Sequence, residues 1–173
     1  LLEDLDGVES VEPNVFYSLI WQTPNADTAP LPVLDEEQRP GTRPNDPMYK
    51  HQWHMDMVKA EGAWAITKGK GVIVAVIDTG VSPGKLKNGN KSKFKRVPDL
   101  KQTDLVPGYD FVANKADPSD GNGHGTHVAG TIAQSTNNAF GVVGLAYEAK
   151  IMPIKVLSDR GFGSVGAIAN GIR

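Results

Sequence analysis

Two short segments of this chain carry side chains suited to acid–base chemistry. The first is an apolar run at 72–77 that ends in Asp78, and the second is a glycine-rich stretch in which Gly123 and Gly125 flank His124. A fixed imidazole can take a proton from a hydroxyl nucleophile, and a carboxylate beside it holds its tautomer and orientation. The two segments therefore predict a carboxylate–imidazole pair that acts as a general base.

Each member of this pair also has an ordinary structural explanation. Asp78 could cap the turn at Thr79 and Gly80, and a lone histidine at the start of a helix is often structural. Asp-Thr-Gly also occurs in aspartic proteases, but these need two such carboxylates that share a proton, and this chain has one Asp-Thr-Gly. The pair remains the better explanation because the two segments occur together in one chain.

A zinc site is the other chemistry that these histidines allow. His124 and His127 form a His-x-x-His pattern, but no third His or Cys lies nearby and no Glu stands between them. Zinc is therefore the weaker hypothesis, and we expect His127 to be a packed residue of the helix.

The segments that would position the pair alternate between strands and helices. The run at 72–77 is rich in β-branched residues, which suits a strand covered on both faces of a parallel sheet. Asp56 can cap an earlier helix that ends near Gly69. Further strands are expected at 108–113 and 151–157, and further helices at 124–134 and 164–173. This order predicts an α/β fold, a doubly wound parallel sheet with helices on both faces. Asp78 would lie at the carboxyl end of its strand, where the sites of such sheets collect.

Composition limits the class of protein. With 173 residues, 39% of them hydrophobic and 22% charged, the chain can bury one core and is typical of a soluble globular protein. A net charge of −2 gives no reason to expect a nucleic-acid partner, and we interpret the lysine-rich segment 85–96 as a surface loop. No run approaches the ~18 apolar residues of a membrane span. The chain has no cysteine, so we expect no disulfide. We also expect a monomer.

Two segments precede the α/β pattern. Residues 1–20 combine leucines at helical spacing with an extended stretch, and 21–45 is rich in proline and poor in apolar residues. Such a segment buries too little surface to offset the entropy of ordering it, so we expect an extended linker there. The α/β pattern itself occupies 46–173.

Three segments, 74–81, 122–131 and 151–172, together resemble the N-terminal half of a subtilisin-like (subtilase) serine protease, and thermitase-like members in particular. The resemblance covers 45–173 almost continuously, and its His-Gly-Thr-His-Val-Ala-Gly block is long and specific. It implies a serine-type endopeptidase in which Asp78 orients and His124 is the general base. It also implies that the nucleophilic serine and the oxyanion-binding asparagine lie outside this chain, which by itself would be inert.

The resemblance further implies a substrate-binding edge. In the family, the stretch equivalent to 156–166 pairs with the backbone of an extended peptide, as a strand added to a sheet. The residues expected to bind peptide or protein substrates are Leu157, Gly161, Phe162, Gly163, Val165 and Ile168. The ordinary alternative is a glycine-rich turn between a strand and a helix.

Calcium is the cofactor that the resemblance implies, as a structural ion. The matching ligands would be the side chains of Asp46, Asp99 and Asn138 and the backbone carbonyls of Ser135, Phe140 and Val142. Carboxylate, amide and carbonyl oxygens suit Ca²⁺. Without the resemblance these would be ordinary polar loop residues. The family's usual His-Pro-Asp-Leu reads Val-Pro-Asp-Leu at 97–100, after the lysine-rich insertion.

The leading segment resembles the end of an inhibitory propeptide. The resemblance implies that 1–20 is an intramolecular inhibitor, that 21–45 is the processing linker, and that the protein is secreted. Two other functions remain open at this point. One is a catalytically inactive subtilase-like domain used for binding or regulation, and the other is a metal-binding α/β domain that uses His124 and His127.

Overall fold

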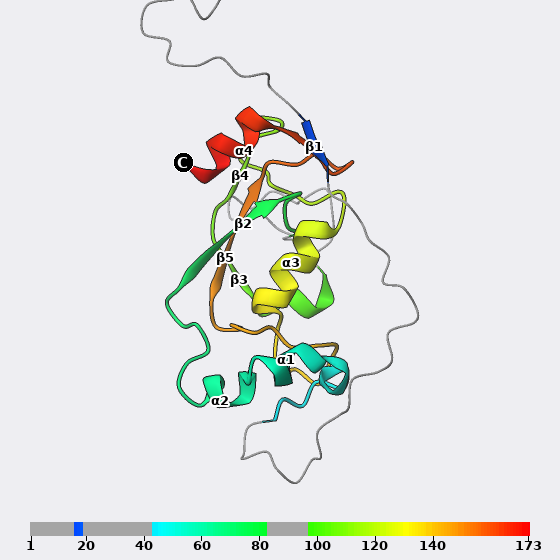
Figure 1. Cartoon of the computed structure of the whole chain (residues 1–173), viewed down its shortest axis with the longest axis vertical. Coiled ribbons are helices and arrows are strands. Elements are labelled where there is room, and N and C mark those ends of the chain that lie inside the picture. The colour runs from blue at the N-terminus through cyan, green and yellow to red at the C-terminus, as the bar shows by residue number, and fades with distance from the viewer. Residues whose placement is uncertain (1–15, 19–42, 83–96) are drawn as a thin grey trace, which may run out of the picture.

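The structure is a computed structural model that describes residues 16–18, 43–82 and 97–173 (Figure 1). The predictions made for the rest of 1–20, for most of the linker 21–45 and for the lysine-rich segment 85–96 lie outside the described residues.

A parallel sheet forms the centre of the described part. Its strands are β2 (Ile73–Asp78), β3 (Asp104–Leu105), β4 (Tyr109–Asp110) and β5 (Lys150–Lys155). Strand β5 pairs with β2 over the full length of both, from Ile73↔Lys150 to Asp78↔Lys155, and it also pairs with β3 and β4. The strand expected at 108–113 is reduced to β4, because Asp110 Oδ1 accepts the backbone N–H groups of Val112 and Ala113 and turns the chain.

Helices cover both faces of this sheet. On one face, α3 (His124–Ala133) packs its small residues Ala129 and Ala133 against Val76 of β2 and Ile151 of β5. On the other face lies α4 (Val165–Ile172), where a Cβ on Gly171 would be 3.7 Å from Ile77 Cγ2. Val76 and Ile77 point to opposite faces because successive strand residues alternate. The α/β fold expected from the sequence, with helices on both faces, is confirmed (Figure 1).

The single helix expected between Asp56 and Gly69 is wrong. The chain forms a 3-10 turn, η3 (Tyr49–His51), and then two short helices, α1 (Trp53–Met57) and α2 (Ala60–Trp64). Lys59 separates the helices with a left-handed φ of 54°, and Asp56 lies inside α1, whose N-cap is Gln52. The break lets both helices contribute to one cluster, which contains Tyr49, Met55, Ala60, Trp64 and Val143.

A second, two-stranded sheet joins distant parts of the chain. Strand β1 (Phe16–Ser18) runs antiparallel to β6 (Phe162–Ser164), with Tyr17 opposite Gly163.

A short 3-10 turn, η4 (Pro98–Leu100), contributes the buried Leu100 to the core beneath α3. No helix in the described part of the chain is long and apolar enough to cross a membrane.

Candidate active site

The structure brings Asp78 and His124 into direct contact. Asp78 is the last residue of β2 and His124 the first of α3. His124 Nδ1 lies 2.8 Å from both Asp78 Oδ1 and Asp78 Oδ2. Asp78 is only 8% exposed, and its Oδ1 also accepts the backbone N–H of Thr79 at 2.6 Å. A carboxylate in this place favours the proton on Nδ1, which leaves the lone pair of Nε2 available for a general base.

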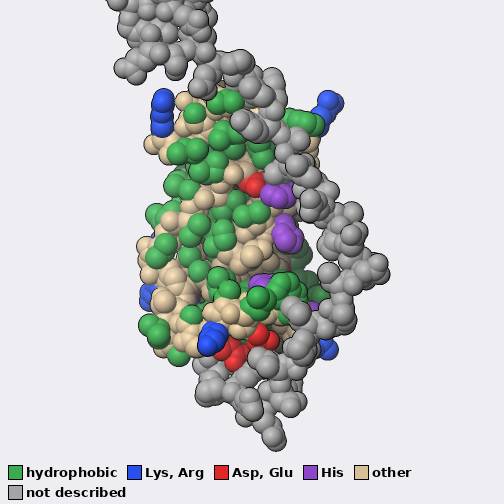
Figure 2. Space-filling model, viewed as in Figure 1, with side chains coloured by type: hydrophobic (Ala, Val, Ile, Leu, Met, Phe, Trp, Pro, Cys, Tyr) green, Lys and Arg blue, Asp and Glu red, His purple; other side chains and the backbone are tan. Residues whose placement is uncertain are grey.

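Glycines on both sides allow this contact. A Cβ on Gly125 would lie 2.2 Å from the carbonyl oxygen of Gly80 and 3.1 Å from Asp78 Cβ. Gly80 has a φ of 103°, and a Cβ there would lie 2.3 Å from the carbonyl oxygen of Pro118. The start of α3 can therefore approach the end of β2 this closely because Gly125 lacks a side chain, and Gly80 lets the segment that begins at Pro118 approach the same strand end. Figure 2 shows histidine side chains on the face over α3, one of them beside an acidic side chain.

A second buried carboxylate, Asp120, lies behind the pair and was not found from the sequence. It is 3% exposed and accepts hydrogen bonds from Thr79, Asn122, Gly123 and Thr126. Burial by itself would raise the pKa of Asp120, but the hydrogen bonds outweigh this effect, so that its pKa lies below the ordinary value. The N-cap preference for aspartate could not have found it, because the N-cap of α3 is Gly123, three residues further along the chain.

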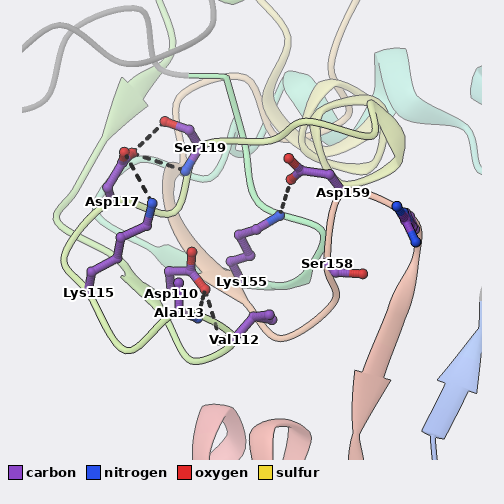
Figure 3. A pocket seen from close by; sticks show the side chains of 10 residues that line it. Asp110, Val112, Ala113, Lys115, Asp117, Ser119, Lys155, Ser158 and Asp159 are labelled. Atoms are coloured by element: carbon purple, nitrogen blue, oxygen red, sulfur yellow. Dashed lines mark hydrogen bonds and ion pairs between the residues drawn. The ribbon is translucent and has the colours of Figure 1, made fainter.

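Lys155 connects the end of β2 to the loop that precedes β6. Its Nζ is buried, donates to the carbonyl oxygen of Thr79 at 2.6 Å and lies 3.0 Å from Asp159 Oδ1. Figure 3 shows this ion pair beside a hollow of about 370 Å³, across which Asp110, Lys115 and Asp117 also project. Lys155, the last residue of β5, therefore contacts both the backbone of Thr79, next to Asp78, and Asp159 in the 158–161 turn.

The predicted substrate-binding residues lie in the 158–161 turn, in strand β6, in a core cluster and beside an apolar hollow. Residues 158–161 form a turn that contains Gly161, and Phe162–Ser164 then form the strand β6; substrate binding at this strand stays a prediction. Gly163 is buried, and a Cβ there would lie 2.3 Å from the carbonyl oxygen of Val156. The remaining candidates are Gly161, a buried turn residue; Phe162, half exposed; Leu157, in a core cluster; Ile168, packed against that cluster; and Val165, beside Ile168 in an apolar hollow of about 470 Å³.

The profile of the subtilase family matches residues 69–173, which is more than half of the chain. This chain belongs to the subtilase family. Thermitase of Thermoactinomyces vulgaris is 41% identical to it over 130 residues, which are 75% of this chain and 42% of thermitase. The extracellular basic protease of Dichelobacter nodosus is 34% identical over 165 residues, covering 74% of this chain and 25% of that protein.

A solved structure of proteases from Pseudoalteromonas arctica superposes with a TM-score of 0.62 at 34% identity. The match covers 76% of this chain and 43% of the other. This subtilase chain therefore spans less than half the length of the relatives that it matches.

The residues expected to hold calcium converge on the loop after α3. Asp46 Oδ2 accepts the N–H of Asn137 at 2.8 Å, and Asp46 Oδ1 accepts that of Asn138 at 3.4 Å. Asp99 Oδ1 accepts from Asn138 Nδ2 at 2.8 Å, and Asp99 Oδ2 accepts from the N–H of Val142 at 3.0 Å. Two carboxylates from distant segments thus accept hydrogen bonds from the same loop.

The other expected ligands are arranged around these carboxylates. The N–H of Ser135 donates to the carbonyl oxygen of Asp99 at 2.8 Å, and Ser135 Oγ accepts the N–H of Gln102. Phe140 is exposed, and its N–H donates to Asn138 Oδ1. In this arrangement the amide nitrogen of Asn138, and not its oxygen, faces Asp99.

The donor set contains the carboxylate and amide groups that a hard divalent cation takes, but each carboxylate oxygen of Asp46 and Asp99 accepts an N–H group in this structure. Asp46 and Asp99 are 4% and 3% exposed, and within 43–82 and 97–173 neither forms an ion pair with a basic side chain. Buried carboxylates are costly unless a cation or strong donors compensate their charge. An oxygen-only ligand set would require the side-chain amide of Asn138 to turn its oxygen toward Asp99.

His127 lies on the outside of α3, so the expectation of a packed residue was wrong. The residues that face the sheet are the small ones at 125, 129 and 133, four apart, and this spacing turns His127 outward. His127 lines a hollow of about 520 Å³ together with His54 and Gln52. Over the described ranges, no three His, Cys, Asp or Glu residues are grouped as a metal site.

Proposed function

We propose that this chain supplies the acid and the base of a serine-type endopeptidase that acts on peptides or proteins. The observation that carries the proposal is the contact of His124 Nδ1 with both oxygens of Asp78 at 2.8 Å. A seryl Oγ–H would give its proton to His124 Nε2 while Oγ attacks the peptide carbonyl carbon. His124 then gives that proton to the leaving amine, and water releases the acyl group by the reverse route. Asp78 stays ionised throughout.

The nucleophilic serine and the oxyanion donor are proposed to lie outside residues 1–173, so that the chain alone is inert. The support for this is exposed apolar surface at two places. Val72 and Ile73 at the start of β2 are exposed, and Ile172 of α4 is 68% exposed. Apolar patches of this kind are typical of surfaces that other parts of a protein cover.

The edge strand β6 is proposed to bind the substrate backbone, and residues 1–20 to act as an intramolecular inhibitor. The antiparallel pairing of β1 with β6 supports both parts of this proposal. An extended segment added to a sheet edge gains backbone hydrogen bonds whatever its sequence. The corresponding domain division is 1–20 as the end of the propeptide, 21–45 as the processing linker and 46–173 as the N-terminal part of the catalytic domain.

A structural calcium ion held by Asp46, Asp99 and Asn138 is part of the same proposal. When bound, it would neutralise two buried carboxylates and join three distant segments, which would stabilise the folded state. We also propose that the protein is secreted and monomeric, on its likeness to a relative named as extracellular. Fractionation of expressing cells and sedimentation of the purified product test these two points.

The test is hydrolysis of a fluorogenic peptide by the full-length protein that carries this chain. We expect turnover by the wild type and none by His124→Ala, with the same circular dichroism spectrum for both. A synthetic peptide of residues 8–20 should inhibit competitively, whereas a scrambled version should not. Turnover by His124→Ala at the wild-type rate would exclude His124 from the mechanism.

A catalytically inactive binding or regulatory domain is the second candidate. The pairing of β1 with β6 favours it to the extent that this edge can hold an extended peptide without any nucleophile. A folded full-length protein that binds the 8–20 peptide but hydrolyses no substrate would support this function over the first.

A further inference from the structure

We propose that Asp120 is a positioning residue for the Asp78–His124 pair, a carboxylate that fixes both partners through their sequence neighbours. The inference rests on the proposed function, because precise placement of the pair matters to turnover only if the pair acts as a base. Asp120 acts through the residues next to Asp78 and His124 in the sequence. It bonds to residues 79, 122, 123 and 126.

One oxygen of Asp120 spans the two segments. Its Oδ1 accepts from Thr79 Oγ1, from the N–H of Asn122 and from the N–H of Gly123, each at 2.9 Å. Thr79 directly follows Asp78, and Gly123 directly precedes His124. One atom therefore determines the separation of the strand end from the helix start.

The other oxygen holds the first turn of α3. Asp120 Oδ2 accepts from the N–H of Thr126 at 3.0 Å and from Thr126 Oγ1 at 2.6 Å. The first N–H groups of a helix have no partner within the helix, and a carboxylate beside them also stabilises the helix dipole. With both oxygens engaged, Asp120 can neither rotate nor move without breaking several bonds.

The hydroxyl of Thr79 connects this carboxylate to the residue that follows His124. Thr79 is 0% exposed, and its Oγ1 donates to Asp120 Oδ1 while accepting the N–H of Gly125 at 2.9 Å. The Nζ of Lys155 holds the carbonyl oxygen of the same threonine. The bond from Thr79 Oγ1 to Asp120 Oδ1 connects the end of β2 to the start of α3. A residue that only capped α3 would not need this bond, so the bond distinguishes positioning from capping.

The test compares Asp120→Asn with Asp117→Asn in the full-length protein. In Asp120→Asn, the new NH₂ group would face N–H groups that can only donate. Asp117 lies on the same loop but pairs with Lys115. A displacement of about 1 Å at the reacting groups can cost about 10²-fold in rate. We therefore expect kcat of Asp120→Asn to fall on the order of 10²-fold with little change in KM, and Asp117→Asn to behave as wild type.

Thr79 gives a second test if Asp120→Asn does not fold. Thr79→Val removes the hydroxyl that joins the two segments, while Thr79→Ser keeps it. We expect Thr79→Val to lower kcat and Thr79→Ser to restore it. A folded Asp120→Asn protein with kcat within about threefold of wild type would overturn the proposal, as would equal kcat for Thr79→Val and Thr79→Ser; the threefold limit is small beside the 10²-fold expected for misplacement.

A readout besides turnover separates this inference from the proposed function. The proton between His124 Nδ1 and Asp78 should give a low-field ¹H resonance in the wild type. We expect it to shift or vanish in Asp120→Asn and to stay unchanged in Asp117→Asn. If the wild type hydrolyses no peptide, the proposed function fails, but the resonances still decide whether Asp120 positions the pair. An unchanged resonance in Asp120→Asn would contradict the inference.

Discussion

Replacement of Asp78 by Asn separates the orienting effect of the carboxylate from its size. In the structure, Asp78 Oδ1 accepts the N–H of Thr79 at 2.6 Å, and both oxygens lie 2.8 Å from His124 Nδ1. In Asp78→Asn the amide oxygen keeps the bond to Thr79, because that N–H can only donate. The amide NH₂ then occupies the Oδ2 position and faces Nδ1, which must become an acceptor.

This exchange selects the wrong tautomer of His124. With the proton on Nε2, the imidazole cannot take a proton from a serine hydroxyl. The loss expected for a triad in this state is about 10⁴-fold in kcat, which corresponds to about 5.4 kcal/mol of activation free energy. Stability should change little, because the amide fills the same volume and still hydrogen-bonds to both the N–H of Thr79 and Nδ1 of His124.

The assay is steady-state hydrolysis of a fluorogenic peptide by the full-length protein, with thermal unfolding measured on the same samples. Asp104→Asn serves as the matched control, because Asp104 is an exposed carboxylate that pairs with Lys150, at the opposite end of β5 from the site. A loss of less than about tenfold in folded Asp78→Asn, against the 10⁴-fold expected, would refute the assignment of Asp78 as the orienting acid.

Three further predictions concern stability. Chelation of calcium should lower the melting temperature of the wild type but not of Asp46→Asn, and a site at 100 times its Kd contributes about 2.7 kcal/mol; an equal decrease in both proteins would exclude this site. Because the folded-state pKa of Asp120 is lowered, its ionised form adds stability above the unfolded value of 3.8, and this stability is lost as the pH falls through the folded pKa. Urea unfolding of Asp120→Asn should therefore depend less on pH below about pH 4 than that of the wild type; identical profiles would contradict this. Gly125→Ala should cost about 1–3 kcal/mol, because its Cβ would lie 2.2 Å from the carbonyl oxygen of Gly80, whereas Gly62→Ala in α2 meets nothing within 4 Å and should be neutral or stabilising. Equal unfolding free energies for the two alanine variants would count against the close approach of α3 to β2.

The sequence was sufficient for the sheet and for the central pair because both depend on local patterns. The run that forms β2 is apolar and β-branched throughout, and such runs have few alternatives to a buried strand. Asp78 and His124 stand where a strand ends and a helix begins, and the glycines beside them indicate a close approach. These signals lie within a few residues of each group.

The features that the sequence did not reveal depend on contacts between distant residues. Lys59 interrupts the expected helix with a left-handed φ, and residues of both short helices pack in the cluster around Trp64; a lysine is not a residue type that predicts such a break. Asp120 and Lys155 look like ordinary loop and strand-end residues until Thr79 is placed between them. The outward direction of His127 follows from which face of α3 packs on the sheet.

The central claim is that His124 of this chain deprotonates a serine. An organophosphorus reagent that reacts covalently with activated serines tests this claim directly. Mass spectrometry of the full-length protein then locates the modified residue. We expect one serine outside residues 1–173 to be labelled in the wild type and none in His124→Ala. Labelling of His124→Ala at the wild-type rate, or a folded wild type that takes up no label, would contradict the account.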